Sequence, residues 1–252
     1  MGIYQDPFDR GSLVNEHEGL RNPRTGALYT FRRGIPVFLP PQIVEGPTQR
    51  YQRLYDRIAP LYDVSTRLSA RWKSGAEEKR RRTYLQALET HPGGNLLEVS
   101  VGTGCNWPFL PRDLIFHGLD LSWNMLARCR RHASRLGLQA ELCQGLAEHL
   151  PYPDDQFDCV LHVGGINFFS DQKAALSEMV RVARPGTRLL VVDETEELAQ
   201  RHENKIFAAA FFKNRPRRIE IPTALLPPGM QEIHSETICD NELYLLTFRK
   251  PA

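Results

Sequence analysis

The sequence predicts a doubly wound α/β fold with a small N-terminal appendage. Three observations support this: strand-like and helical segments alternate from Asn95 onward, a loop with two glycines follows the first strand-like run, and two further strand-like runs close the chain. Strands that alternate with helices imply a parallel sheet with helices on both faces. A chain of 252 residues can bury a substantial core as one principal domain.

The first 47 residues are predicted to be the appendage, because they are rich in Pro, Gly and Arg and lack helical periodicity. Within them, "GALYTFRRGIPVFLPP" is typical of a small strand pair. The main domain is expected over residues 48–252. It begins with helical spacing over residues 48–88, interrupted at Pro60 and Gly75.

The alternating units follow in order. The predicted strands cover residues 95–101, 113–121, 139–145, 157–163 and 186–194. The predicted helices between them cover residues 124–137 and 172–184. The tail "MQEIHSETICDNELYLLTFRK" contains two strand-like runs around a "CDNE" turn, which indicates a terminal antiparallel pair.

Composition excludes several classes of protein. The net charge is only +2, and the basic runs at 79–82, 128–135 and 213–218 are each interpreted as solvated helix faces or loops, so nucleic-acid binding is not predicted. No apolar stretch of about 18 residues and no signal peptide are found, so we expect a cytoplasmic protein without an integral membrane segment. The five cysteines lack CxxC spacing, so neither a metal site nor a disulfide framework is predicted.

The stretch "LLEVSVGTGCN", residues 96–106, indicates a ligand site. Gly102 and Gly104 lack Cβ and let backbone approach a ligand where the first strand feeds a helix. Asp120 ends the next strand, where a carboxylate accepts hydrogen bonds from ribose hydroxyls, so a nucleoside is favoured. Trp107 stands where a dinucleotide fingerprint needs glycine. A tight turn without a ligand is the alternative.

Five segments in family order carry a resemblance over residues 55–194: "YDRIAPLYD", "LLEVSVGTGCN", "HGLDLSWNMLARCRRHA", "GLAEHLPYPDDQFDCVLHVGGINFF" and "MVRVARPGTRLLVVDE". Together they resemble the class I S-adenosylmethionine-dependent methyltransferases, most of all the group that includes the ubiquinone and menaquinone biosynthesis enzymes. The resemblance implies a Rossmann-like seven-stranded sheet with an antiparallel last strand. It also implies S-adenosylmethionine as cofactor and a small, apolar or aromatic acceptor.

The resemblance further implies a set of cofactor-binding residues. Glu98, Gly102 and Gly104 would surround the methionine part, Asp120 the ribose, and Leu121 and Met125 the adenine. The full expected set is Tyr62, Glu98, Gly102, Gly104, Asn106, Asp120, Leu121, Met125 and Ala147. Two positions depart from the family pattern: Leu146 replaces the usual Asp, which leaves the Ala147 amide for the adenine, and Ser100 replaces a usual glycine.

Two residues at the end of the fourth strand are the candidates for the reacting side. His162 is interpreted as a base or substrate-orienting group, or alternatively as a strand histidine satisfied by backbone. Asn167 would orient substrate or close its loop. Residues 206–211 have helical apolar spacing for a substrate lid or for core packing.

Several residues bear on rival functions. The Asn/Asp-Pro-Pro-aromatic motif of base-amino methyltransferases is absent at "VGGINFF", which favours a small-molecule acceptor over nucleic acid. A nucleoside-binding module without catalysis is the alternative from another class, and a dehydrogenase is weakened by Trp107. Residues 20–40 are similar to a zinc-ribbon-like segment whose cysteines are lost, for example to Asn22. We expect this segment to fold without metal and to cover the core or a homodimer interface.

Overall fold

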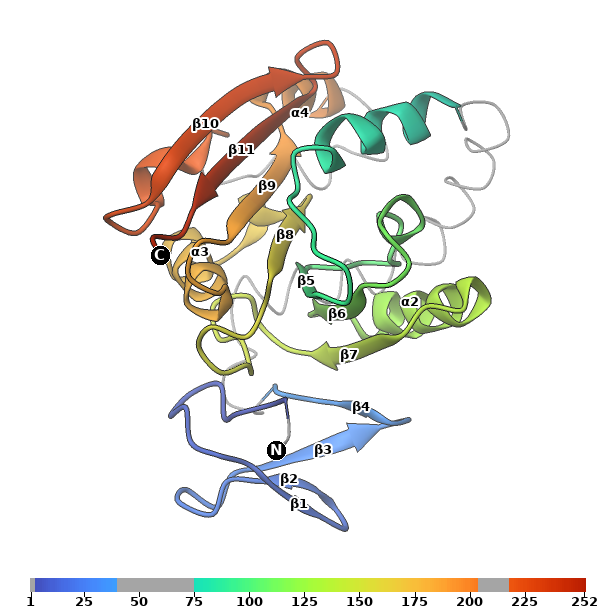
Figure 1. Ribbon diagram of the computed structural model, residues 1–252, viewed down its shortest axis with the longest axis vertical. Helices are drawn as coiled ribbons and strands as arrows, with labels where there is room; N and C mark the ends of the chain where they lie inside the picture. The colour runs from blue at the N-terminus through green and yellow to red at the C-terminus, as the bar shows by residue number, and fades with distance from the viewer. Residues whose placement is uncertain (1–2, 40–74, 204–217) are drawn as a thin grey trace.

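The computed structural model describes residues 3–39, 75–203 and 218–252 and has the predicted α/β architecture. A central sheet carries helices on both faces, and a small antiparallel sheet from the N-terminus lies beside one of its edges (Figure 1). The expected boundary between residues 47 and 48 lies outside the described residues, as does most of the helical region expected over residues 48–88; its last part is a helix over residues 75–85.

The central sheet has seven strands in the order β10-β11-β9-β8-β5-β6-β7. Its strands are β5 (Asn95–Val99), β6 (Ile115–Asp120), β7 (Ala140–Gln144), β8 (Cys159–Val163), β9 (Arg188–Glu194), β10 (Gln231–Ile238) and β11 (Leu243–Arg249). The pairs β5–β6, β5–β8, β6–β7 and β8–β9 are parallel, and β11 is antiparallel to both of its neighbours. The predicted topology, including the antiparallel last strand, is confirmed. The chain reverses its direction of winding at β5, where ligands bind in open sheets of this kind.

Helices cover the two faces of the sheet because each presents one apolar stripe. Helix α2 (Trp123–Leu136) buries Leu126 and Cys129 against one face, and α3 (Gln172–Val182) buries Leu176 and Met179 against the other. The α2 helix is capped by the Ser122 side chain, which accepts from the Met125 amide, and α3 is capped in the same way by Asp171. The Ser122 cap starts α2 three residues after the end of β6, and the Asp171 cap starts α3 after the loop that follows β8.

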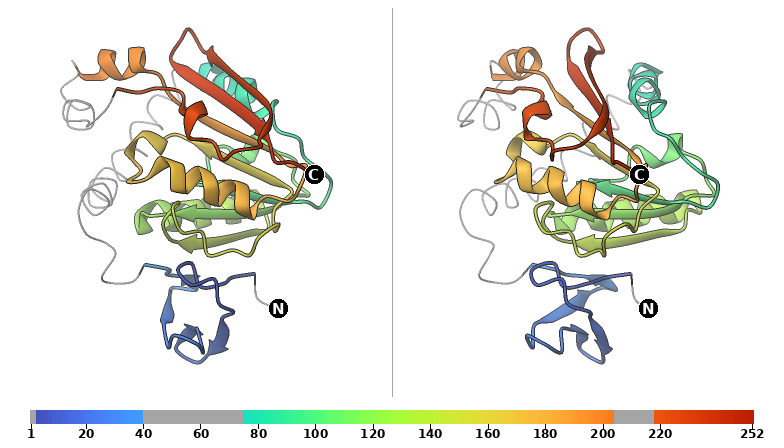
Figure 2. Two further views of the ribbon diagram at one scale, coloured as in Figure 1. Left: turned by 90° about the vertical axis from the view of Figure 1, so that its left-hand side faces the viewer. Right: turned by 60° about the vertical axis from the view of Figure 1, so that its left-hand side comes forward.

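Shorter helices complete the domain. They are α4 (Glu196–Glu203) and the 3₁₀ turns η1 (Trp107–Phe109), η2 (Ile166–Phe168) and η3 (Pro222–Leu225). Figure 2 shows α4 projecting beyond the sheet after β9. Within the described part of the chain, no helix is long and apolar enough to cross a membrane.

The N-terminal module, residues 3–39, is a four-stranded antiparallel sheet. Its strands are β1 (Val14–Glu16), β2 (Gly19–Arg21), β3 (Leu28–Arg32) and β4 (Ile35–Pro36). The predicted strand pair is the β3–β4 hairpin, while β1 and β2 were not predicted. After β4 the chain joins the edge of the central sheet, because Val37 pairs parallel to Gln144 and the Phe38 amide donates to the Gln144 carbonyl at 2.7 Å. The module therefore lies against β7 (Figures 1 and 2).

Candidate active site

The candidate site lies at the carboxyl ends of β5 and β6, where two acidic side chains stand on neighbouring strands. Glu98 lies on β5 and Asp120 is the last residue of β6. Both are buried, at 1% and 9% exposure. Buried carboxylates need hydrogen-bond donors or a cationic partner, so their contacts show what each can hold.

Gly102 and Gly104 have different physical roles in the loop after β5, although both have positive φ. A Cβ built on Gly102 would meet no atom within 4 Å, so this glycine borders open space. A Cβ built on Gly104 would lie 2.9 Å from the Cys129 sulfur on α2. Gly102 therefore fits close approach by a ligand, whereas Gly104 is required for packing against the helix.

Asp120 connects this loop to the start of α2. Its Oδ2 accepts from the Gly102 amide at 2.8 Å, and its Oδ1 accepts from the Ser122 amide at 2.8 Å. The carbonyl of Leu121 accepts from the Gln144 side chain at 2.8 Å. Asp120 and Leu121 thus have defined positions next to the glycine loop.

The two remaining expected adenine contacts, Met125 and Ala147, are each 5% exposed. Met125 lies in the first turn of α2, and its amide donates to the Ser122 hydroxyl. Ala147 follows β7, between Leu146 and His149, which form an isolated antiparallel bridge. The structure therefore brings the ends of β6 and β7 and the start of α2 to one side of the domain.

Glu98 belongs to a hydrogen-bonded network that includes Asn106. The Asn106 amide donates to Glu98 Oε1 at 2.6 Å, while its oxygen accepts from the Tyr84 hydroxyl at 2.7 Å and from Arg81 at 2.6 Å. Burial raises the pKa of Glu98 to about 7, opposed by the bond from Asn106 and the charge of Arg81. Glu98 Oε2 and the Trp107 indole nitrogen are buried, and neither forms a well-aligned hydrogen bond with a described residue, although the indole is close enough to Glu98 to lower its pKa.

That Glu98 oxygen tests whether this chain's residues suit S-adenosylmethionine. A buried carboxylate oxygen whose neighbouring indole donor is poorly aligned gains from a ligand that completes its bonds, and the amino group of a methionine moiety is a cationic donor. Gly102 adds open space along the same loop. The residues present fit the cofactor that the resemblance implies.

Arg81 and Tyr84 were missed by the reasoning from sequence. Arg81 belongs to the basic run at 79–82, which was interpreted as solvated, but its side chain is only 16% exposed and contacts Asn106. Tyr84 is 2% exposed. The available signal was their spacing of three, which places both on one face of a helix.

His162 lies on the opposite face of the sheet from Glu98, since it shares the face of Val160 and Val99. It is fully buried, and its Nδ1 bonds the Val99 carbonyl at 2.9 Å. Because a carbonyl only accepts, Nδ1 carries the hydrogen, and the buried Nε2 has no partner among the described residues. Burial lowers the pKa of His162 to about 4, so the ring is neutral at pH 7.

Asn167 lies in the loop after β8 and bonds a carboxylate that the sequence reasoning did not single out. Its side-chain amide and its backbone amide donate to Asp193 Oδ2 at 2.9 and 3.2 Å, and the Gly165 amide donates to the same oxygen at 3.1 Å. Asp193 is 4% exposed, and burial raises its pKa to about 6 despite these donors. The signal was a carboxylate at the end of a strand, the same signal that identified Asp120.

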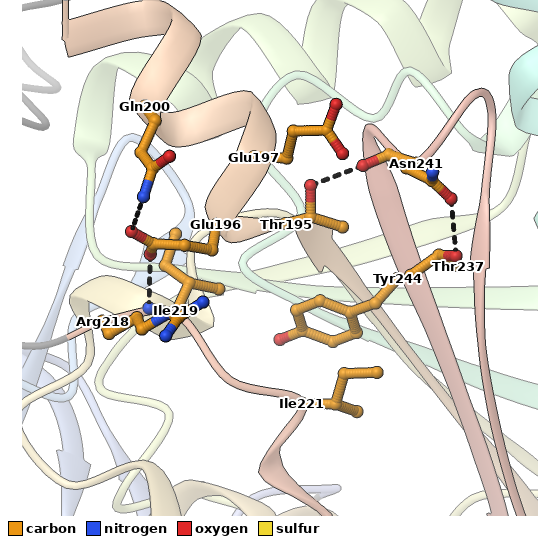
Figure 3. Close-up of a pocket in the computed structure, with 10 residues that line it drawn as sticks. All are labelled: Thr195, Glu196, Glu197, Gln200, Arg218, Ile219, Ile221, Thr237, Asn241 and Tyr244. Atoms are coloured by element: carbon orange, nitrogen blue, oxygen red, sulfur yellow. Dashed lines mark hydrogen bonds between the residues drawn. The ribbon is translucent and has the colours of Figure 1, made fainter.

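A cavity of about 500 Å³ lies beyond the end of β9, between α4 and the β10–β11 turn (Figure 3). Its apolar lining comes from Ile219, Ile221 and the ring of Tyr244. The Tyr244 hydroxyl is buried without a partner among the described residues, and Tyr244 pairs with Asp193 across the strands. The polar lining residues are Thr195, Glu196, Glu197, Gln200, Arg218, Thr237 and Asn241.

The structure brings some of the expected residues together and leaves others undescribed. Tyr62 and the candidate lid at 206–211 are outside the described residues. Glu98, Gly102, Asn106 and Asp120 come together around one loop, whereas the Asp193–Asn167 group belongs to the loop after β8.

Comparisons with known proteins identify a related family. The profile of a family described as "Methyltransferase domain" matches residues 97–191. A phosphatidylethanolamine N-methyltransferase of Cereibacter sphaeroides is 37% identical over 143 residues, which cover 56% of this chain and 66% of that protein. A ubiquinone/menaquinone biosynthesis C-methyltransferase of Geobacter sulfurreducens is 31% identical over 155 residues, which cover 58% of each.

Among solved structures, the [4+2]-cyclase SpnF superposes with a TM-score of 0.65 at 19% identity, over 81% of this chain and 96% of that one, which shows a shared fold. The matched part of the chain spans 66% and 58% of the length of these two curated relatives, which is less than two thirds of each. The strand order, the loop after β5 and these matches lead to one assignment: residues 97–191 match a methyltransferase domain, and the fold and the relatives indicate that this domain is of the class I, S-adenosylmethionine-dependent kind.

Proposed function

We propose that this protein binds S-adenosylmethionine at the carboxyl ends of β5 and β6 and transfers its methyl group to a small apolar or aromatic acceptor. The observation that carries the proposal is the pairing of the Gly102 amide with Asp120 beside a buried Glu98 oxygen that has no well-aligned donor among the described residues. One loop thus presents backbone, a ribose-type acceptor and an anionic group for an amino acid.

Each residue has a separate task in this proposal. Glu98 meets the amino group of the methionine part, and Gly102 leaves room for the chain of the ligand. A carboxylate has about four acceptor sites, so the two amides that Asp120 binds are compatible with ribose hydroxyls. Leu121 and Met125 contact the adenine, and the Ala147 amide serves where Leu146 replaces a polar side chain.

The bound cofactor supplies a methyl group that its sulfonium already makes electrophilic. The protein therefore has to align the acceptor in line with that bond and to exclude water. Asn167 suits this positioning task, because its two bonds to Asp193 hold the loop after β8 in one conformation.

His162 has two proposed roles, and its surroundings support the structural one. Its bond to Val99, its burial and its place on the face opposite Glu98 favour a ring that joins two strands over a base. The His162→Ala variant tests this: turnover that falls far more than stability explains would restore the role of base.

The acceptor class rests on relatives and on the cavity beyond β9. The names of the two relatives indicate a phospholipid and quinone precursors as acceptors, which are molecules with large apolar parts. The apolar lining from Ile219, Ile221 and Tyr244, with a buried hydroxyl, suits an apolar or aromatic body that carries one hydrogen-bond acceptor.

The test is a calorimetric titration with S-adenosylmethionine and its demethylated product, with NADH as a comparison. Methyl-labelled cofactor is then incubated with phenolic quinone precursors and with phosphatidylethanolamine. Saturable binding followed by label in one acceptor supports the proposal. Absence of binding to both sulfur nucleosides overturns it. Binding without transfer to any acceptor would identify a nucleoside-binding module without catalysis.

A further inference from the structure

The N-terminal module touches the central sheet at the strand that precedes the adenine loop. The Phe38 amide donates to the Gln144 carbonyl at 2.7 Å, which adds one parallel step of backbone pairing to the end of β7. Phe38 is 1% exposed and its ring packs 5.2 Å from Tyr4, which in turn lies 5.5 Å from Tyr152 of the central domain. This contact is therefore a packed, desolvated interface.

Gln144 links that interface to the residues that face the nucleoside. Its side-chain amide donates to the Leu121 carbonyl at 2.8 Å, and the next amide, of Gly145, donates to the Asp120 carbonyl at 3.2 Å. Gln144 is 4% exposed, so these bonds are shielded from water. Gln144 thus binds the module through its backbone carbonyl and binds residues 120–121, here called the Asp120–Leu121 corner, through its side-chain amide.

A second contact of the module reaches the same corner from the helix side. The Arg32 guanidinium stacks over the Trp123 ring, with its centre 4.3 Å from the ring centroid. Trp123 is the first residue of α2, directly after the Ser122 cap that binds Asp120. The module therefore supports both segments that flank the ribose and adenine contacts.

Asn22 holds the module together internally. It is fully buried, and its side-chain amide donates to Asp6 at 2.7 Å and to Asp9 at 2.8 Å. Its oxygen accepts from the backbone amides of Arg24 and Thr25. The Asn22 side chain thus joins the turn at residues 6–9 to the turn at residues 22–25. A sheet of this size rarely has enough core to be rigid without such a buried hydrogen-bond network.

We propose that the N-terminal module is a positioning element for the cofactor, which sets the affinity for the adenosine part by holding Gln144 and, through it, the Asp120–Leu121 corner. This inference rests on the proposed function. Gln144 acts through Leu121 and is a positioning residue. Its loss affects the adenosine end of the ligand and leaves the Glu98 end unchanged, because Glu98 is held by Asn106 and not by the module.

The experiment uses the full chain and two ligands that differ in one part. S-adenosylhomocysteine contains adenosine and the amino acid, whereas 5′-methylthioadenosine contains adenosine without the amino acid. Asn22→Ala and Gln144→Met are each expected to weaken both ligands by the same factor, about 5- to 20-fold, the range of a lost coupling between sites. Glu18→Ala, an exposed substitution in the same module, is the matched control and leaves both affinities unchanged.

Hydrogen exchange provides the second readout. Asn22→Ala is expected to speed exchange of the Phe38 and Gly145 amides and to leave β5 protected. Binding of both ligands within twofold of the wild type, in a folded Asn22→Ala protein with faster exchange in the module, overturns the inference. Where Asn22→Ala fails to fold, Gln144→Met decides in the same way. Wild-type protein that binds neither ligand contradicts the proposed function itself, so the two failures are distinguishable.

Discussion

Two regions at the carboxyl edge of the sheet each contain a buried aspartate that fixes a neighbouring loop, but the groups around the two aspartates differ. Asp120 ends β6 and Asp193 lies near the end of β9, and each accepts backbone amides from a glycine-containing loop on a neighbouring strand. Beside Asp120 lies a Glu98 oxygen without a well-aligned donor among the described residues, and open space at Gly102. Both aspartates accept hydrogen bonds on both oxygens, Asp120 from Gly102 and Ser122 and Asp193 from Gly165, Asn167 and Glu194, so the two regions differ in the groups around the aspartates.

Because similar aspartates have different surroundings, a carboxylate at a strand end is not by itself a ligand residue. Its function depends on which hydrogen-bonding groups around it are still unsatisfied in the protein alone. Beside Asp120 the unsatisfied group is the anionic Glu98 oxygen, which suits a cationic ligand group. Beside Asp193, whose bonds hold the loop after β8, it is the neutral Tyr244 hydroxyl, which suits an acceptor atom.

The largest effect on stability is expected for Asp193→Ala. The substitution removes the acceptor of four half-buried donors; an unsatisfied buried group costs about 1–3 kcal/mol, which is reduced here by partial exposure of the donors and by release of a desolvated charge. We expect a loss of about 2–4 kcal/mol in the free energy of unfolding, measured by urea titration. Asp113→Ala, at an exposed position, is the control and should change it by less than about 0.5 kcal/mol. A loss for Asp193→Ala no larger than the control would contradict its structural role.

The affinity for S-adenosylmethionine is expected to depend on pH through Glu98. The free protein holds Glu98 at a pKa of about 7, so below that pH the carboxyl is protonated and loses its attraction for the ligand's ammonium. Between pH 7.5 and pH 6 the dissociation constant should rise by about tenfold, while the ligand's amino group remains mostly protonated. Titrations at several pH values check this, and Glu98→Gln should bind weakly with a flat profile. A slope that persists in Glu98→Gln would assign the titration to another group.

The smallest effect is expected at Ser100. Its φ of 59° lies in the left-handed region, which costs a serine about 1–2 kcal/mol relative to glycine. Ser100→Gly relieves this strain, but glycine loses more entropy on folding, so the net gain should be about 0.5 kcal/mol. Ser100→Ala retains the strain and serves as the control. Equal unfolding free energies for the two variants would show that the strain at this position is negligible.

The alternation of strands and helices predicted the central sheet because each element buries a continuous apolar face that is visible in a short window. The resemblance to a known family added the antiparallel last strand, and both features are confirmed. The strands β1 and β2 were not predicted, because they are only three residues long and the segment after them is joined to distant aspartates through Asn22. Periodicity contains no signal for such contacts.

The candidate site was predictable in part for the same reason. Gly102 and Asp120 were predicted from their places in the loop and at a strand end, and Glu98 was predicted from the resemblance to the family. The different role of Gly104 depends on Cys129, which α2 brings to it from 25 positions along the chain. The roles of Asp193 and Arg81 depend likewise on partners from other elements. Pairing across the sheet, rather than residue type, separates ligand residues from structural ones.

The measurement that tests the central contrast most directly is a calorimetric titration of S-adenosylmethionine into Asp120→Ala and Asp193→Asn, beside the wild type, under conditions in which all three are folded. A charge-assisted bond contributes about 1.5–3 kcal/mol, so Asp120→Ala should raise the dissociation constant by about 10- to 100-fold. Asp193→Asn should change it by less than about threefold, since its bonds hold a loop that does not contact the adenosine in this account. Equal losses in both variants, or a larger loss in Asp193→Asn, would contradict the account.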